Sequence, residues 1–133
     1  MNKSIRIIIV DDNEIDLMIG KRLISRVEAN IVVNTFLSCE SLYEWLNQFK
    51  KEEIPTQWVF LIDIYMPKCN GFEVVKELTN LMKPITKNTS YYLLSATIDF
   101  ADVQRIKMDN TIKEFIGKPI TVDLIQKMLT ENK

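Results

Sequence analysis

Two kinds of spacing between apolar residues alternate along the chain. Short runs of branched apolar residues indicate strands, and stretches with apolar residues three or four positions apart indicate helices. The pattern predicts five strands, at 5–10, 31–37, 58–62, 91–94 and 112–116. Helices are predicted at 13–27, after Ser38 or Ser41 as the capping residue, at 72–82, at 99–108 and after Thr121.

Strands that alternate with helices along the whole chain predict a fold of the α/β class. Such connections join parallel strands, cover both faces of the sheet and, being right-handed, make it doubly wound. No repeat or linker interrupts the pattern, although the polar connection from Lys50 to Gln57 is long. We expect residues 1–133 to form one domain, because residues 119–133 suffice for a single helix.

The composition is that of a folded chain, and it restricts the classes of partner that the chain is expected to bind. Hydrophobic residues make up 47% of the 133 residues and charged residues 26%, which argues against disorder. The formal net charge of −1 offers no basic surface for nucleic acid, so no direct DNA binding is expected. The sequence has neither a membrane-length apolar stretch nor a signal peptide, which predicts a cytoplasmic protein without membrane contact.

Histidine and cysteine usage restricts the chemistry further. The chain has no histidine, which excludes histidine-based catalytic triads, metal sites and pH switches. Its two cysteines, Cys39 and Cys69, are too few for a disulfide framework and lack the spacing of a metal site. We predict that both are reduced thiols, as is usual in the cytoplasm.

Polar side chains stand where four of the predicted strands end. They are Asp11 and Asp12 after the first strand, Asp63 at the end of the third, Ser95 after the fourth and Lys118 after the fifth. In an open parallel sheet the carboxyl ends of the strands share one edge, where ligands bind. The five side chains are therefore predicted to converge in one cleft.

Three carboxylates, one ammonium and one hydroxyl in a cleft indicate phosphoryl transfer. Clustered carboxylates cannot all stay ionised without compensation, which Mg²⁺ would supply. The ammonium and the hydroxyl can then donate to a phosphoryl group. A carboxylate has to be the nucleophile because histidine is absent. Asp63 is the best candidate, since it ends the central strand among apolar residues, whereas Asp11 and Asp12 are better placed to hold the cation.

The same residues resemble the receiver domain of bacterial two-component response regulators over about residues 5–129. The resemblance rests on four elements in order, each at the end of its own strand. They are VDDN at 10–13, Asp63 followed by Met66, Pro67 and Gly71, the pair Ser95-Ala96, and the pair Lys118-Pro119. It implies a flavodoxin-like fold with a five-stranded parallel sheet in the order 2-1-3-4-5.

The resemblance also implies a role for each matching residue. Asp63 is implied to be the phosphoacceptor, and Ser95 and Lys118 to bind the phosphoryl group beside the small Ala96. Phe115 is implied to act with Ser95 as a switch residue. The Lys118-Pro119 peptide bond is commonly cis in the family. The implied Mg²⁺ ligands are Asp11, Asp12, Asp63 and the backbone carbonyl of Tyr65.

The implied function is a phosphorylation-dependent switch in a two-component system. A sensor histidine kinase or a histidine phosphotransfer protein would supply the phosphoryl group. An unidentified downstream protein would read the face formed by the helix at 99–108, the strand at 112–116 and the last helix. The implied catalysis is limited to self-phosphorylation and autodephosphorylation, so no enzyme with an external substrate is expected, and a weak homodimer is allowed.

Other interpretations remain open at this point. A phosphorelay intermediate that passes the group on to a histidine phosphotransfer protein fits equally well, as does a receiver excised from a larger regulator or hybrid kinase. A haloacid-dehalogenase-type phosphatase is disfavoured, because that family needs an aspartate where this chain has Tyr65. Taken singly, Ser95 could be a loop hydroxyl, Lys118 a surface lysine and Phe115 a core aromatic.

Overall fold

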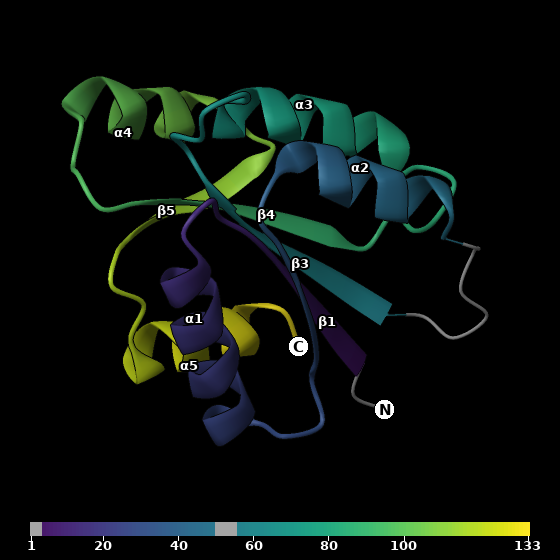
Figure 1. The fold of residues 1–133 in the computed structure, drawn as a ribbon. Helices are drawn as coiled ribbons and strands as arrows, with labels where there is room; N and C mark the ends of the chain where they lie inside the picture. The colour runs from purple at the N-terminus through teal and green to yellow at the C-terminus, as the bar shows by residue number, and fades with distance from the viewer. Residues whose placement is uncertain (1–3, 50–55) are drawn as a thin grey trace.

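The fold is a five-stranded parallel sheet in the order β2-β1-β3-β4-β5 (Figure 1). The computed structural model describes residues 4–49 and 56–133. Most of the predicted connection 50–57 therefore lies outside the described residues. The strands are β1 Ser4–Val10, β2 Val32–Phe36, β3 Thr56–Asp63, β4 Thr89–Ser95 and β5 Ile112–Gly117. The predicted fold class and strand order are confirmed.

Five helices connect and follow the strands. They are α1 Glu14–Val27, α2 Cys39–Asn47, α3 Gly71–Leu81, α4 Phe100–Met108 and α5 Val122–Glu131. Each begins after a polar residue whose side chain accepts a hydrogen bond from a backbone N–H of the first turn, which is why the helices start there. Of the two candidates for the start of α2, Ser38 is the cap, since its hydroxyl accepts the N–H of Ser41.

The helices cover the sheet on both faces. Figure 1 shows α2, α3 and α4 over one face and α1 and α5 over the other. Each face of the sheet has its own hydrophobic core. Alternate residues of β1 pack into one core or the other, because side chains along a strand point to opposite faces. Ile8 packs with the core beneath α2, α3 and α4, and Ile7 and Ile9 pack with the core beneath α1 and α5. None of the helices in the described ranges is long and apolar enough to cross a membrane.

The strand register aligns the carboxyl ends of the inner strands. Val10 pairs with Ile62, so Asp11 and Asp63 follow neighbouring positions on β1 and β3. Further along the sheet, between β4 and β5, Ser95 pairs with Gly117, and the N–H of Lys118 donates to the carbonyl of Ser95 at 2.9 Å. Residues far apart in sequence therefore meet at one edge.

Candidate functional site

Three carboxylates meet at this edge of the sheet. Asp11, Asp12 and Asp63 each offer an oxygen, and these oxygens lie within 4.8 Å of one another. Asp11 is 1% exposed and Asp63 7% exposed, while Asp12 faces solvent. One oxygen of Asp11 accepts the N–H of Asn13 at 2.9 Å, which fixes the carboxylate at the start of α1. Hard oxygen ligands in this number suit a divalent cation that keeps several of its waters.

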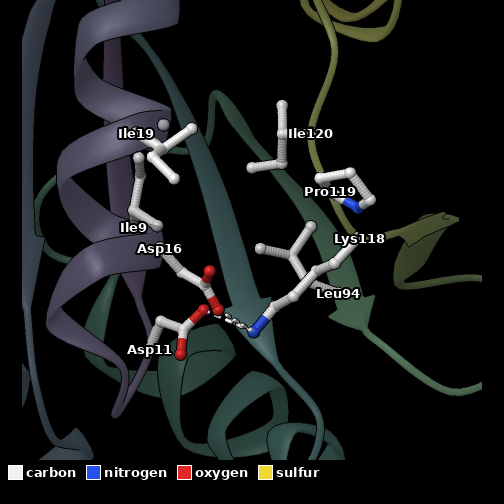
Figure 2. Close-up of a pocket in the computed structure, with 9 residues that line it drawn as sticks. Ile9, Asp11, Asp16, Ile19, Leu94, Lys118, Pro119 and Ile120 are labelled. Carbon is white, nitrogen blue, oxygen red and sulfur yellow. Dashed lines mark hydrogen bonds and ion pairs between the residues drawn. The ribbon is translucent and has the colours of Figure 1, made fainter.

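The Lys118 ammonium balances part of this charge. Its Nζ lies 2.6 Å from Asp11 Oδ2, 3.2 Å from Asp16 Oδ2 and 3.4 Å from Asp63 Oδ2 (Figure 2 shows the first two). Burial alone would lower the pKa of Lys118, but the hydrogen bond to Asp11 and the charges of Asp63 and Asp11 outweigh it, so this pKa is raised. Lys118 therefore stays cationic among the carboxylates.

Asp16 is a neighbour of Lys118 that the sequence pattern did not identify. The predicted site residues all lie at the ends of strands, whereas Asp16 reaches the site from the first turn of α1. The positive end of the helix was sufficient to explain an acidic residue in that turn. The signal that could have identified Asp16 is its position in the first turn of a helix that begins at the edge of the sheet where the site lies.

Burial sets the acidity of Asp63. Together with the smaller effect of the neighbouring Asp11 charge, it raises the pKa of Asp63 to about 6. The ammonium of Lys118 and the N–H of Tyr65, which donates to Asp63 Oδ1 at 3.4 Å, act in the opposite direction. A carboxylate with this pKa is largely ionised at neutral pH yet poorly solvated, which makes it a competent nucleophile.

Replacing Asp63 by Asn is expected to stabilise the cation-free fold near neutral pH. A carboxyl whose pKa rises from 3.8 to about 6 on folding binds its proton more tightly in the folded state. Its contribution to stability is present at low pH and is lost as the pH rises through about 6. We expect Asp63→Asn to raise the free energy of unfolding by about 1–2 kcal/mol at pH 8 in a chelator.

Urea denaturation between about pH 4 and pH 8 measures this difference. The gain should fall towards zero near pH 4, where the folded wild type already carries the proton on Asp63. Added Mg²⁺ should stabilise the wild type more than Asp63→Asn. A difference that does not change with pH would show that the raised pKa of Asp63 is not its cause.

The other predicted site residues take up varied positions around the acidic cluster. Ser95 is buried, and its hydroxyl accepts the N–H of Thr97 at 3.2 Å. Ala96 is exposed at the start of the loop that follows β4. Phe115 is half-buried on β5, packed against the core beneath α2, α3 and α4. The Lys118-Pro119 bond is cis. The structure thus brings Asp11, Asp12, Asp63 and Lys118 into contact range, with Ser95 on the adjacent strand.

Tyr65 lies in the loop between β3 and α3, and its side chain links this loop to α4. The side chain is about half exposed, and its hydroxyl donates to the carboxylate of Asp102 on α4. The backbone of Tyr65 forms an isolated antiparallel bridge with Asn70, the cap of α3. The backbone carbonyl of Tyr65 therefore belongs to a loop that is attached to both helices.

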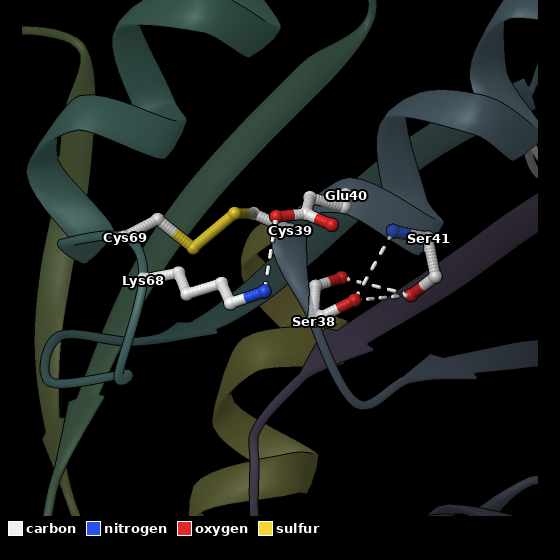
Figure 3. The surroundings of a disulfide bond; sticks show 6 residues. All are labelled: Ser38, Cys39, Glu40, Ser41, Lys68 and Cys69. Carbon is white, nitrogen blue, oxygen red and sulfur yellow. Dashed lines mark hydrogen bonds and ion pairs between the residues drawn. A yellow bond between two sulfur atoms is a disulfide. The ribbon is translucent and has the colours of Figure 1, made fainter.

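A disulfide joins Cys39 and Cys69, so the prediction of two reduced thiols is wrong for this structure (Figure 3). Cys39 is the first residue of α2, and Cys69 lies two residues before α3. The two cysteines are 30 positions apart, but α2 and α3 lie on the same face of the sheet and begin at the same edge. Sequence spacing could not reveal this proximity. The bond attaches the loop after Asp63 to the start of α2.

The chain belongs to the response regulator receiver domain family. It matches the model of that family over residues 7–130. The residues at the carboxyl edge of the sheet are thus placed within a domain of two-component signalling. No curated protein sequence matches the chain.

Several solved structures share the fold over nearly the whole chain. A response regulator receiver protein from Dyadobacter fermentans is 26% identical, with a TM-score of 0.81 and coverage of 96% of this chain and 97% of that one. The Vibrio cholerae chemotaxis protein CheY4 is 18% identical, with a TM-score of 0.75 and coverage of 98% and 99%. The Saccharomyces cerevisiae structure of Ypd1 with the receiver domain of Ssk1 is 16% identical, with a TM-score of 0.76 and coverage of 99% and 90%.

Proposed function

We propose that this receiver is a phosphorylation-dependent signalling switch that accepts a phosphoryl group on Asp63. The observation that carries the proposal is a buried carboxylate with a pKa of about 6 that faces a partly buried ammonium and lies beside two further carboxylates. The donor would be a phosphohistidine of a sensor kinase or of a histidine phosphotransfer protein. Mg²⁺ is the cofactor in this proposal, held by Asp11, Asp12, Asp63 and the backbone carbonyl of Tyr65.

The transfer itself needs little covalent chemistry from the protein. An oxygen of Asp63 attacks the phosphorus, the bond from phosphorus to the donor's imidazole nitrogen breaks, and its electron pair leaves with the imidazole. Bound Mg²⁺ would neutralise charge on the phosphoryl oxygens. Lys118 donates to one of these oxygens from its partly buried position, and Ser95 donates its hydroxyl to another. Ala96 leaves room beside the group because its side chain is a single methyl.

The output would lie on the face formed by α4, β5 and α5. When Ser95 turns towards the phosphoryl group, space opens for the half-buried Phe115 to turn inward, and this repacks the face. Exposed apolar side chains on and near α4 support a protein partner there, namely Ile98, Phe100 and Met108. A ligand or modification shifts such an equilibrium only through differential affinity for the two states. The downstream partner must therefore bind one arrangement of this face more tightly.

A second candidate function is a relay step, in which Asp63 passes the phosphoryl group to a histidine of another protein. The neighbour from yeast is a receiver bound to a histidine phosphotransfer signalling protein, and this favours the candidate. Transfer from phosphorylated Asp63 to such a protein would distinguish the relay from a terminal switch. A receiver that forms part of a larger regulator or hybrid kinase would use the same site.

The remaining parts of the proposal concern setting and activity. We place the protein in the cytoplasm, where ATP is available to phosphorylate kinase histidines. The only reactions proposed are its own phosphorylation and dephosphorylation, without turnover of an external substrate. Direct DNA binding is not proposed, since the formal net charge is −1.

Acetyl phosphate with Mg²⁺ tests the proposal directly. The intact mass of the wild type is expected to increase by one phosphoryl group, and a chelator or Asp63→Ala should abolish the increase. Asp123→Asn, which removes an exposed carboxylate on α5, is the matched control and should be phosphorylated normally. Beryllofluoride with Mg²⁺ should shift the NMR signals of Ser95 and Phe115. An unmodified wild type, or a phosphoryl group that persists in Asp63→Ala, would refute the proposal.

A further inference from the structure

Asp16 holds the Lys118 ammonium without contributing to the acidic cluster. Its Oδ2 lies 3.2 Å from Lys118 Nζ, closer than the 3.4 Å that separates this nitrogen from Asp63. Among the described residues, the cluster that could hold a metal consists of Asp11, Asp12 and Asp63, and Asp16 is not part of it. Asp16 therefore contacts the site through Lys118.

The hydrogen-bonding capacity of the ammonium is fully used in this arrangement. A lysine ammonium has three N–H donors, and here three carboxylates, those of Asp11, Asp16 and Asp63, surround it. The two shorter distances are those to Asp11 and Asp16, so the ammonium lies slightly nearer to the start of α1 while it still contacts Asp63 at 3.4 Å. Figure 2 shows the ammonium directed at these two carboxylates.

The surroundings of Lys118 limit where else its ammonium can go. The aliphatic part of the side chain lies over a small cavity of about 30 Å³, whose walls include Leu94, Pro119 and Ile120. These three side chains offer the ammonium no acceptor, so the acceptors that line the cavity beside it are the carboxylates of Asp11 and Asp16.

A cation at the acidic cluster would compete with Lys118 for Asp11 and Asp63 but not for Asp16. The pair of Asp16 and Lys118 would then persist when the site is loaded for phosphorylation. A phosphoryl group on Asp63 would need an N–H of Lys118, and Asp16 would compete with it for the same ammonium.

We propose that Asp16 is a positioning residue that retains the Lys118 ammonium on the α1 side and thereby slows phosphorylation of Asp63. This inference rests on the proposed function and concerns the same site. Asp16 is 39% exposed at its side chain and Lys118 13%, so the pair is partly screened by solvent. Asp16→Asn is expected to raise the rate of phosphorylation by acetyl phosphate and the affinity for beryllofluoride about three- to fivefold.

Glu14→Gln is the matched control for this substitution. Glu14 lies in the same first turn of α1 and is exposed, so its replacement removes the same charge from the same helix end. Glu14→Gln should phosphorylate at the wild-type rate. The side-chain NMR signal of the Lys118 ammonium, recorded without metal, should shift in Asp16→Asn and stay in place in Glu14→Gln, which a purely helix-stabilising role of Asp16 would not produce.

The outcomes separate this inference from the proposed function. If Asp16→Asn phosphorylates no faster than Glu14→Gln, the inference is wrong while the function stands. If Asp16→Asn is slower, Asp16 assists Lys118 and the proposed direction of its effect is overturned. A wild type that takes up no phosphoryl group refutes the proposed function itself, and an unshifted Lys118 signal would then also refute the hold of Asp16 on the ammonium.

Discussion

Reducing the Cys39–Cys69 disulfide is expected to lower the free energy of unfolding by about 3–4 kcal/mol. The bond closes a loop across a sequence separation of 30, and the unfolded chain gains the corresponding entropy when the bond opens. The melting temperature should fall by roughly 10 °C for a chain of this size. Thermal unfolding with and without reductant measures the effect.

Two alanine variants make this test specific. Cys69→Ala and Cys39→Ala should each lose most of this stability, and the double variant should lose about as much as either, because one bond is removed in every case. Cys69→Ala is the cleaner substitution, since Cys39 is buried and its replacement also removes core contacts. Reductant should leave all three variants unchanged. Two titratable thiols in the native wild type would contradict the bond.

The disulfide also bears on the site, because Cys69 lies in the loop between Asp63 and α3. Cytoplasmic proteins seldom keep disulfides, so in the proposed cytoplasmic setting the reduced form would be the one that meets the kinase. Phosphorylation should therefore be measured in both redox forms. Besides the disulfide, the loop has two further attachments, the bridge of Tyr65 with Asn70 and the contact of Tyr65 with Asp102.

Gly71→Ala is expected to destabilise the fold by about 2 kcal/mol and to slow phosphorylation about tenfold or more. A Cβ at Gly71 would lie 2.9 Å from the backbone oxygen of Asp63 and 2.9 Å from Cα of Ile64. These are backbone atoms at the end of β3 and directly after it, so either the backbone at Asp63, the proposed phosphoacceptor, or the start of α3 has to shift. Overpacking of this kind costs about 3 kcal/mol, and the better helix propensity of alanine in α3 returns at most about 1 kcal/mol.

Gly117→Ala is the control for the loss of stability. A Cβ at Gly117 would meet no atom within 4 Å, so the same substitution should change the free energy of unfolding little. Urea denaturation compares the two variants, and acetyl phosphate labelling measures the phosphorylation rate of Gly71→Ala against wild type. Equal stability of Gly71→Ala and Gly117→Ala would show that the end of β3 gives way without cost.

Much of the fold could be predicted because its signals are local. The run at 5–10 and the helical spacing of 13–27 each identify an element without reference to the rest of the chain. The starts of β3 and β4 were less accurate: these strands begin at Thr56 and Thr89, earlier than predicted. Polar residues extend both strands at their N-terminal ends, because the backbone of β3 pairs with β1, and that of β4 with β3, before the apolar run begins. Pairing of this kind leaves no apolar pattern in the sequence.

The same distinction between local and non-local signals applies to the candidate site. Asp11, Asp12, Asp63 and Lys118 were predictable as neighbours because each follows or ends a strand, and parallel strands end at one edge. Asp16 and the two cysteines reach the same edge from helices and a loop. Their positions depend on where the helices lie over the sheet, which no spacing along the chain records.

The sequence by itself determined the α/β class, the strand order through the family resemblance, and the row of polar residues at the carboxyl ends of the strands. These follow from periodicity and from topological rules that hold for any parallel sheet. Only the tertiary structure decided which carboxylates surround Lys118, how far burial raises the pKa of Asp63, and that Cys39 meets Cys69. These depend on distances of a few ångströms between side chains of different elements, and such distances are set by packing.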